Sequence, residues 1–154
     1  MTSIVVRRRT ESPRSAVWPL LVDASSWVGW CGYESVEVDI DCEAGGLRRL
    51  QSGGAVIDEV FTVVEEERLY AYRHLSGLPV DRYLGEIELE EASDGGTVVE
   101  WRAEVGPTGG GEEIVAALRA LIGVSLDGLV RAAAGGTSRW RSGQGRLGDS
   151  GAEE

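Results

Sequence analysis

The chain has few of the residues on which metal and redox chemistry usually depend. Its 154 residues include one histidine, His74, and two cysteines, Cys31 and Cys42, whose separation fits no common metal-binding spacing. We therefore expect no metal or other cofactor, and we expect the two cysteines to be reduced thiols. Lysine is absent, so that all 15 basic residues are arginines.

Positive charge is scarce, and long apolar runs are missing. A formal net charge of -11 argues against binding to nucleic acid or to an anionic membrane, because both need a cationic face. The basic cluster "RRR" at 7–9 indicates a charged strand rather than a targeting signal. No segment has the apolar run of a signal peptide or of a membrane span. The prediction is a cytoplasmic monomer or homodimer with no nucleic-acid or membrane partner.

The hydrophobic pattern changes its period along the chain. After a first strand that contains "SIVVRRRT", the segments "PRSAVWPLLVDA" and "SSWVGW" have the spacing of two short helices. Strict alternation then predicts about six antiparallel strands, each with one face turned to water. Their segments are "ESVEVDID", "GGLRRLQSGG", "AVIDEVFTVVEE", "RLYAYRHL", "VDRYLGEIELEEA" and "TVVEWRAEV".

The C-terminal part predicts one long helix and a tail. Residues 112–134 begin with two acids, which suit the N-terminal end of a helix dipole, and continue with an apolar stripe. Residues 135–154 contain six glycines and no periodicity, so we predict a disordered tail after a single domain of residues 1–134. Trp140 is the one aromatic residue of that tail.

This order of elements predicts an α+β fold in which a curled sheet of six to seven strands wraps around the long helix. The apolar face of such a sheet must be covered, and the C-terminal helix is the element available to cover it. One helix cannot fill the concave side, so a cavity is expected between helix and sheet. Small residues at 123, 125 and 128 would leave room for a ligand there.

Several segments also resemble the START-like (SRPBCC) superfamily, in particular its polyketide cyclase/dehydrase family. The resemblance covers roughly residues 3–133 and is carried by "SPRSAVWPLLVDASSWVGW", "GGLRRL", "VIDEVFTVVEEERLYAYRHLSGLPVDRY" and "GTVVEWRAEV". It implies a helix-grip fold around a hydrophobic cavity. Members of this superfamily bind lipids, carry ligands, or cyclise and dehydrate poly-β-ketone chains, so the resemblance does not fix one activity.

Strand parity selects candidate pocket residues. In "LYAYRHL", Tyr70, Tyr72 and His74 share one face, and we expect that face to be inward because Arg73 on the other face would be a costly buried charge. The resemblance also implies that positions 72 and 74 face the cavity. An inward His74 is either a general acid or base, or a neutral imidazole hydrogen-bonded to its surroundings.

The adjacent acids in "VIDEVF" point to opposite faces of a regular strand, so we expect one of Asp58 and Glu59 to point inward; the alternative is that the sheet bends there and both acids are solvated. An inward carboxylate would be a catalytic base or half of a buried ion pair. Arg48 has the fork geometry to anchor an oxyanion, although most such arginines are solvated at the surface.

Two functions fit this pattern. The first is a cofactor-independent cyclase or cyclase-dehydratase of secondary metabolism acting on a polyketide-type substrate, free or bound to a carrier protein. The second is a non-catalytic carrier or sensor of a hydrophobic ligand. For the enzyme, the predicted catalytic residues are His74, Glu59 and Tyr72. The predicted ligand-binding residues are Arg48, Tyr70, Tyr83, Trp101 and Ser125.

Overall fold

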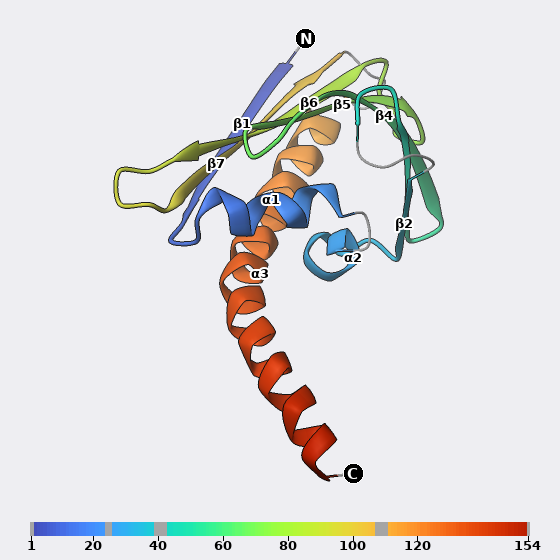
Figure 1. The fold of residues 1–154 in the computed structure, drawn as a ribbon. Helices are drawn as coiled ribbons and strands as arrows, with labels where there is room; N and C mark the ends of the chain where they lie inside the picture. Colours follow the sequence, from blue (N-terminus) through green and yellow to red (C-terminus); the bar gives the residue numbers. More distant parts are fainter. Residues whose placement is uncertain (1, 24–25, 39–42, 107–110, 154) are drawn as a thin grey trace.

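Seven antiparallel strands form a curled sheet around a long helix (Figure 1). The structure, a computed structural model, describes residues 2–23, 26–38, 43–106 and 111–153, with side chains up to residue 135 except at position 52. The strands lie in the order β1-β7-β6-β5-β4-β3-β2. The elements are β1 (Thr2–Thr10), α1 (Arg14–Val22), α2 (Ser26–Cys31), β2 (Ser35–Val38), β3 (Leu47–Ser52), β4 (Ala55–Glu65), β5 (Leu69–Ser76), β6 (Tyr83–Glu91), β7 (Thr97–Val105) and α3 (Glu112–Glu153). The predicted α+β helix-grip architecture is confirmed.

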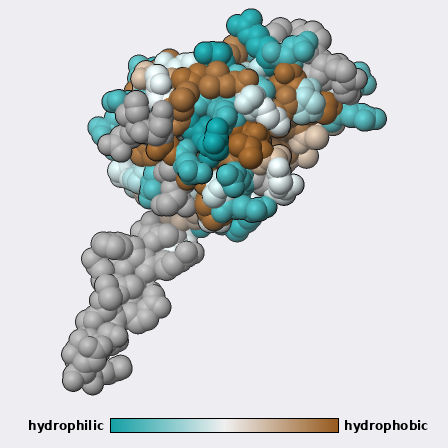
Figure 2. Space-filling view, turned by 90° about the vertical axis from the view of Figure 1, so that its right-hand side faces the viewer, coloured by the Kyte–Doolittle hydropathy of each residue, from teal (hydrophilic) through white to brown (hydrophobic). Residues whose placement is uncertain are grey.

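Strands β6 and β7 show the alternation that the sequence predicts. Their odd-numbered apolar residues are buried on the concave side of the sheet, and Ile87 and Val99 are fully buried. On the opposite face, Arg102 pairs with glutamates of its own and the neighbouring strand. Figure 2 shows hydrophobic and hydrophilic residues mixed on the side of the molecule where β2 and β4 lie. The sheet therefore separates an apolar concave side from a convex side rich in ion pairs.

All three helices cover the concave side of the sheet. The sequence argument assumed that α3 alone covers it. Figure 1 shows α1 crossing α3, with α2 beside it. The indole N–H of Trp27 donates to the Leu21 carbonyl at 2.8 Å, and that of Trp30 donates to the Leu20 carbonyl at 3.0 Å. These two bonds hold α2 against the end of α1, so their buried tryptophans fill much of the space that we expected to be cavity.

The small residues of α3 serve helix packing more than ligand space. A Cβ atom added at Gly128 would lie 2.1 Å from the Trp30 carbonyl oxygen, so glycine is needed for the close approach of α2. At Gly123 the nearest atom is a guanidinium nitrogen of Arg8, at 3.5 Å. The expectation that these two glycines leave room for ligand is wrong. Ser125 remains on the cavity side.

The first strand is fastened by its three consecutive arginines. Arg7 pairs with Glu100 of β7 at 2.8 Å, and Arg8 pairs with Asp127 of α3 at 2.7 Å. Arg9 pairs with Asp94 in the turn between β6 and β7. The "RRR" cluster is a charged strand, as predicted, and each arginine ties β1 to a different element.

The long helix extends further than the sequence indicated. We predicted that it ends at residue 134, whereas α3 runs to Glu153. The side chain of Trp140 lies outside the described residues. The division into a domain of residues 1–134 and a separate tail stays a prediction.

Candidate functional site

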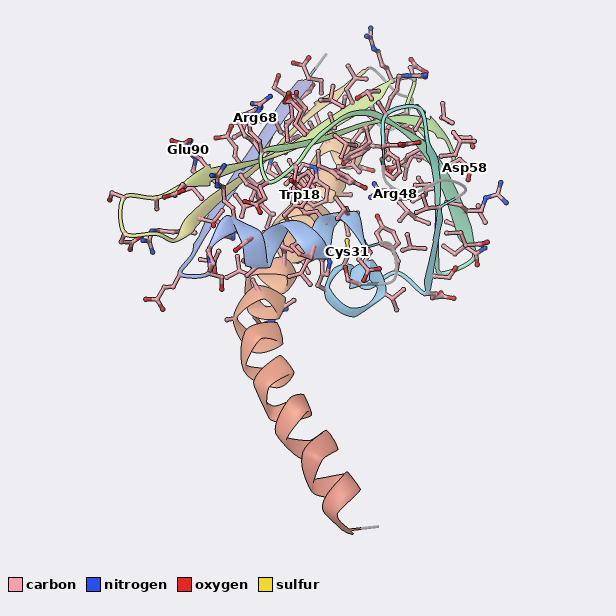
Figure 3. The ribbon with its side chains drawn as sticks, viewed as in Figure 1. Trp18, Cys31, Arg48, Asp58, Arg68 and Glu90 are labelled. Atoms are coloured by element: carbon pink, nitrogen blue, oxygen red, sulfur yellow. The ribbon has the colours of Figure 1, made fainter. Side chains whose placement is uncertain are left out.

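Strand β4 places its two adjacent acids on opposite faces of the sheet, as their parity requires. Asp58 lies outside the curve of the sheet and accepts from Arg49 Nε at 2.8 Å, whereas Arg48 lies inside it (Figure 3). Glu59 is the inward acid and is 5% exposed. In the strand register it lies opposite Arg48 of β3 on one side and His74 of β5 on the other.

Arg48 and Glu59 form a buried ion pair. Arg48 Nε donates to Glu59 Oε1 at 3.0 Å, and the two side chains are 2% and 6% exposed. A second guanidinium nitrogen of Arg48 donates to the same carboxylate oxygen, and a third donates to the Tyr70 hydroxyl. Burial opposes the charge of Arg48, but the Glu59 carboxylate and the Tyr70 and Tyr72 side chains together outweigh it and raise the pKa of Arg48. Arg48 is therefore buried, although most arginines lie at the surface.

Aromatic rings surround the guanidinium group. Its carbon lies 4.2 Å from the centroid of the Trp27 ring, which is the geometry of a cation–π contact. Three further ring centroids, those of Phe61, Tyr70 and Tyr72, lie between 5.1 and 5.7 Å away. Hydrogen bonds and ring contacts thus fix Arg48 in one orientation.

A second hydrogen-bonded group lies beside the ion pair. The Trp101 indole N–H donates to the Tyr72 hydroxyl oxygen at 3.0 Å, and the hydroxyl oxygens of Tyr72 and Tyr83 are 3.0 Å apart. Burial raises the pKa of both phenols, so they stay protonated throughout the physiological range.

Gly85 determines where the Tyr72 ring lies. The two residues are cross-strand partners on β5 and β6, and a Cβ atom at position 85 would lie 2.2 Å from Tyr72 Cζ. The ring therefore packs over the bare backbone of the neighbouring strand. A glycine inside a strand often marks such a close approach of another group to the backbone.

The cavity between the sheet and α3 is small. Its volume is about 30 Å³, which is room for a water molecule, whereas sites for drug-sized ligands measure roughly 300–1,000 Å³. Leu121, which is 43% exposed, and the half-buried Tyr33 and Leu78 belong to its lining. The other lining residues are Trp27, Arg48, Ile57, Glu59, Tyr72, Tyr83, Trp101, Leu118, Ile122 and Ser125.

His74 lies next to this cavity and is not among the residues that line it. Its Nε2 accepts the backbone N–H of Leu78 at 3.1 Å, and its ring centroid lies 6.5 Å from that of Tyr83. A ring nitrogen that accepts a hydrogen bond carries no proton of its own. In this arrangement His74 holds the loop after β5, which supplies Leu78 to the cavity wall.

A thiol lies close to the same region. Cys31 Sγ is 3.1 Å from the Ser125 hydroxyl, and burial raises the pKa of Cys31 to about 11. A protonated thiol is a poor nucleophile, so Cys31 is a packing residue here. Cys42 lies outside the described residues. Within the described ranges, no group of three or more His, Cys, Asp or Glu side chains is arranged to hold a metal ion.

Comparison with known proteins decides the family. Residues 1–134 match the family described as "Polyketide cyclase / dehydrase and lipid transport". The chain belongs to this family. No curated protein matches it significantly. In the part of the chain that the structure describes, no helix is long and apolar enough to cross a membrane.

Solved structures share the fold of this family member. An uncharacterised protein from Bacillus thuringiensis is 22% identical, covering 85% of this chain and 98% of its own, with a TM-score of 0.74. The protein XoxI from Bacillus cereus is also 22% identical, covering 86% and 95%, with a TM-score of 0.76. The Aha1 dimer from Colwellia psychrerythraea is 15% identical, covering 86% and 96%, with a TM-score of 0.72. At these identities the likeness shows the fold alone.

Most of the predicted site residues of this polyketide cyclase/dehydrase family member meet at the cavity. Glu59, Tyr72, Arg48, Tyr83, Trp101 and Ser125 all line it. Tyr70 lies behind this wall and bonds to Arg48. Trp27 and Tyr33 also line the cavity, and the sequence analysis named neither as a site residue. Neither carries a local signal, because their places at the cavity depend on how α2 packs against the sheet.

Proposed function

We propose that the protein binds a hydrophobic small molecule in the cavity between the sheet and α3, and that it cyclises or dehydrates a polyketide-type substrate there. The observation that supports this most is the Arg48–Glu59 ion pair in an otherwise apolar cavity wall. A buried ion pair contributes little to stability compared with apolar packing of the same volume. Strongly perturbed, buried titratable groups are concentrated at functional sites.

Glu59 is the base of the proposed reaction. It removes a proton from a carbon between two carbonyl groups, which leaves an enolate on the substrate. A phenol hydrogen of the Tyr72–Tyr83 pair donates to the enolate oxygen, and the enolate carbon attacks a second carbonyl to close the ring. The alkoxide that forms takes the proton back from Glu59, so that the step is balanced without a cofactor. We assign His74 a positioning role, because its Nε2 is bonded to Leu78.

The test is turnover of a short β-polyketone thioester, with cyclised or dehydrated products measured by mass spectrometry. We expect Glu59→Gln to lower the rate by about 10²-fold or more, in the range of a positioned acid or base. Tyr72→Phe leaves the hydroxyl hydrogen of Tyr83 free to donate and should lower the rate less than Glu59→Gln. Asp58→Asn, which changes the neighbouring acid on the outer face, should leave the rate unchanged. Equal rates in Glu59→Gln and the unmodified protein would remove the catalytic assignment.

The role of His74 is tested in the same assay. A positioning residue should raise KM more than it lowers kcat when it is changed to alanine, and the variant His74→Gln should restore part of the loss through its side-chain oxygen. A His74→Ala variant with a collapsed kcat at unchanged KM would instead make His74 the acid or base.

One observation favours a non-catalytic carrier as the second candidate. The Glu59 carboxylate already accepts two hydrogen bonds from Arg48, and the Trp101 N–H is bonded to the Tyr72 hydroxyl, which suits a wall that holds a ligand without transforming it. Chromatography coupled to mass spectrometry after incubation with the thioester distinguishes the two functions. A carrier releases the compound unchanged in retention time and mass, whereas a cyclase releases an isomer with a new retention time and a dehydratase releases a product that has lost water.

A further inference from the structure

The charges in the cavity wall cancel. Of the described residues that line the cavity, Arg48 and Glu59 carry formal charges, and they are bonded to each other at 3.0 Å. The remaining lining residues are aromatic or aliphatic, apart from Ser125. A ligand anion entering this cavity would meet a guanidinium group whose counter-charge is already in place. The free energy that the ligand anion loses on leaving water would then not be recovered by pairing with Arg48.

The two phenols of the wall have one hydrogen more than their mutual bond uses. Tyr72 and Tyr83 bring two hydroxyl hydrogens, and the contact between their oxygens uses one of them. The Trp101 N–H brings its own hydrogen to the Tyr72 oxygen. Whichever phenol donates to the other, one O–H is left to donate elsewhere. Because the pKa values of both phenols are raised, this hydrogen is retained at neutral pH.

From these two counts we infer that the cavity selects an uncharged, apolar ligand with a carbonyl oxygen that accepts the surplus phenol hydrogen, and that it rejects the carboxylate of the same shape. This inference rests on the proposed function, since it concerns the ligand of that cavity. The small volume of the cavity requires the ligand to displace its rim. Leu121 at 43% exposure and the half-buried Leu78 and Tyr33 are the lining residues placed to move.

A matched pair of probes tests the selection. 2-Acetonaphthone and 2-naphthoate share the naphthalene ring and a carbonyl group. The ketone has a methyl group where the carboxylate has a charged oxygen. A third probe, 2-ethylnaphthalene, has the same ring and no carbonyl. Quenching of tryptophan fluorescence by each probe at pH 8 and moderate salt gives the dissociation constants. We expect the ketone to bind the unmodified protein at least about tenfold more tightly than the carboxylate, as one unpaired buried charge requires.

Removing the counter-charge should reverse this preference. In Glu59→Gln the guanidinium group of Arg48 loses its anion, so 2-naphthoate should bind more tightly than the ketone. The matched control is Asp58→Asn, which breaks an ion pair of the same kind on the outer face of the same strand. Its ketone-to-carboxylate ratio should equal that of the unmodified protein.

The phenol count is tested separately and does not depend on the Glu59→Gln variant folding. Tyr83→Phe still has one uncommitted hydroxyl hydrogen, on Tyr72, and should retain the affinity for the ketone. The triple variant Tyr72→Phe/Tyr83→Phe/Trp101→Phe has neither that hydrogen nor the indole N–H that loss of the Tyr72 oxygen would free, and it should lose about tenfold for the ketone relative to 2-ethylnaphthalene. A triple variant with an unchanged ratio of these two affinities contradicts the assignment of the surplus donor.

The outcomes separate this inference from the function on which it rests. If 2-naphthoate binds the unmodified protein as tightly as the ketone, or more tightly, the selection for uncharged ligands is wrong and a ligand-binding cavity remains. If none of the three naphthalenes binds, both the selection and the cavity's proposed function are wrong.

Discussion

Breaking the Arg48–Glu59 pair from one side should cost far more stability than replacing the whole pair. Arg48→Met leaves the Glu59 carboxylate buried without its cation, and Glu59→Leu leaves the guanidinium group without its anion. The side chains are 2% and 6% exposed, so water cannot take over the lost partner. Removing one member of such a pair costs about 3–5 kcal/mol of unfolding free energy.

The double variant Arg48→Met/Glu59→Leu leaves no unpaired charge and keeps most of the buried volume. Replacements of this kind in other proteins range from neutral to stabilising. We therefore expect the double variant to lie within about 1.5 kcal/mol of the unmodified protein, the usual cost of a volume-conserving swap. The coupling energy of the cycle is then several kcal/mol. Tyr70, which loses its bond to Arg48, accounts for part of any remaining loss.

Urea unfolding measured by tryptophan fluorescence gives each free energy, and the thermal midpoint gives an independent reading. A loss of about 3–5 kcal/mol lowers the midpoint of a domain of this size by roughly 6–20 °C. The pair Arg49–Asp58 provides the control cycle on the convex face. Its side chains are 55% and 29% exposed, and its coupling should stay below about 1 kcal/mol. Single variants of the buried pair that cost no more than those of the surface pair would refute the reasoning.

Three further predictions follow from single contacts. Gly85→Ala should push the neighbouring phenol ring off the strand and lower the unfolding free energy by about 1–3 kcal/mol in urea titrations; an unchanged value would mean that the ring has free space. Gly128→Ala should destabilise the protein, because its Cβ would lie 2.1 Å from the Trp30 carbonyl oxygen, whereas Gly123→Ala should be neutral or stabilising by up to about 1 kcal/mol through helix propensity. Burial raises the pKa of Cys31 from 9.0 to about 11, so at pH 8 this residue should contain roughly 100-fold less thiolate than an exposed cysteine. Its reaction with iodoacetamide should be slower by the same factor, and the rate should increase up to about pH 11. Fast labelling of the folded protein, measured by mass spectrometry of the peptide, would contradict this.

The architecture could be read from the sequence because its signals are local. Strands β6 and β7 alternate without interruption, so parity alone gave the buried set that includes Ile87 and Val99. The site depends on register, which is not local. Parity required one inward acid at positions 58 and 59, but the choice of Glu59 follows from its pairing with Arg48 on the next strand.

The size of the cavity could not be derived in the same way. Its walls are formed by side chains from the sheet and from all three helices, and the volume left between them is a small difference between large volumes. Trp27 shows the difficulty, because its ring packs over Arg48 only once α2 is held against α1. The loop contact of His74 likewise depends on the path of the chain through Leu78 and not on the strand pattern.

The arginines of β1 also determine how this protein can meet other chains. β1 lies at one edge of the sheet, where unpaired backbone groups would otherwise accept a strand from another molecule. The guanidinium groups of β1 form ion pairs with β7, α3 and the β6–β7 turn, and they place several charges at that edge. At the opposite edge, β2 offers only the four residues Ser35–Val38 within the described chain. Continuous sheets across two copies are therefore disfavoured at both edges, and any homodimer should form through its helices or the convex face.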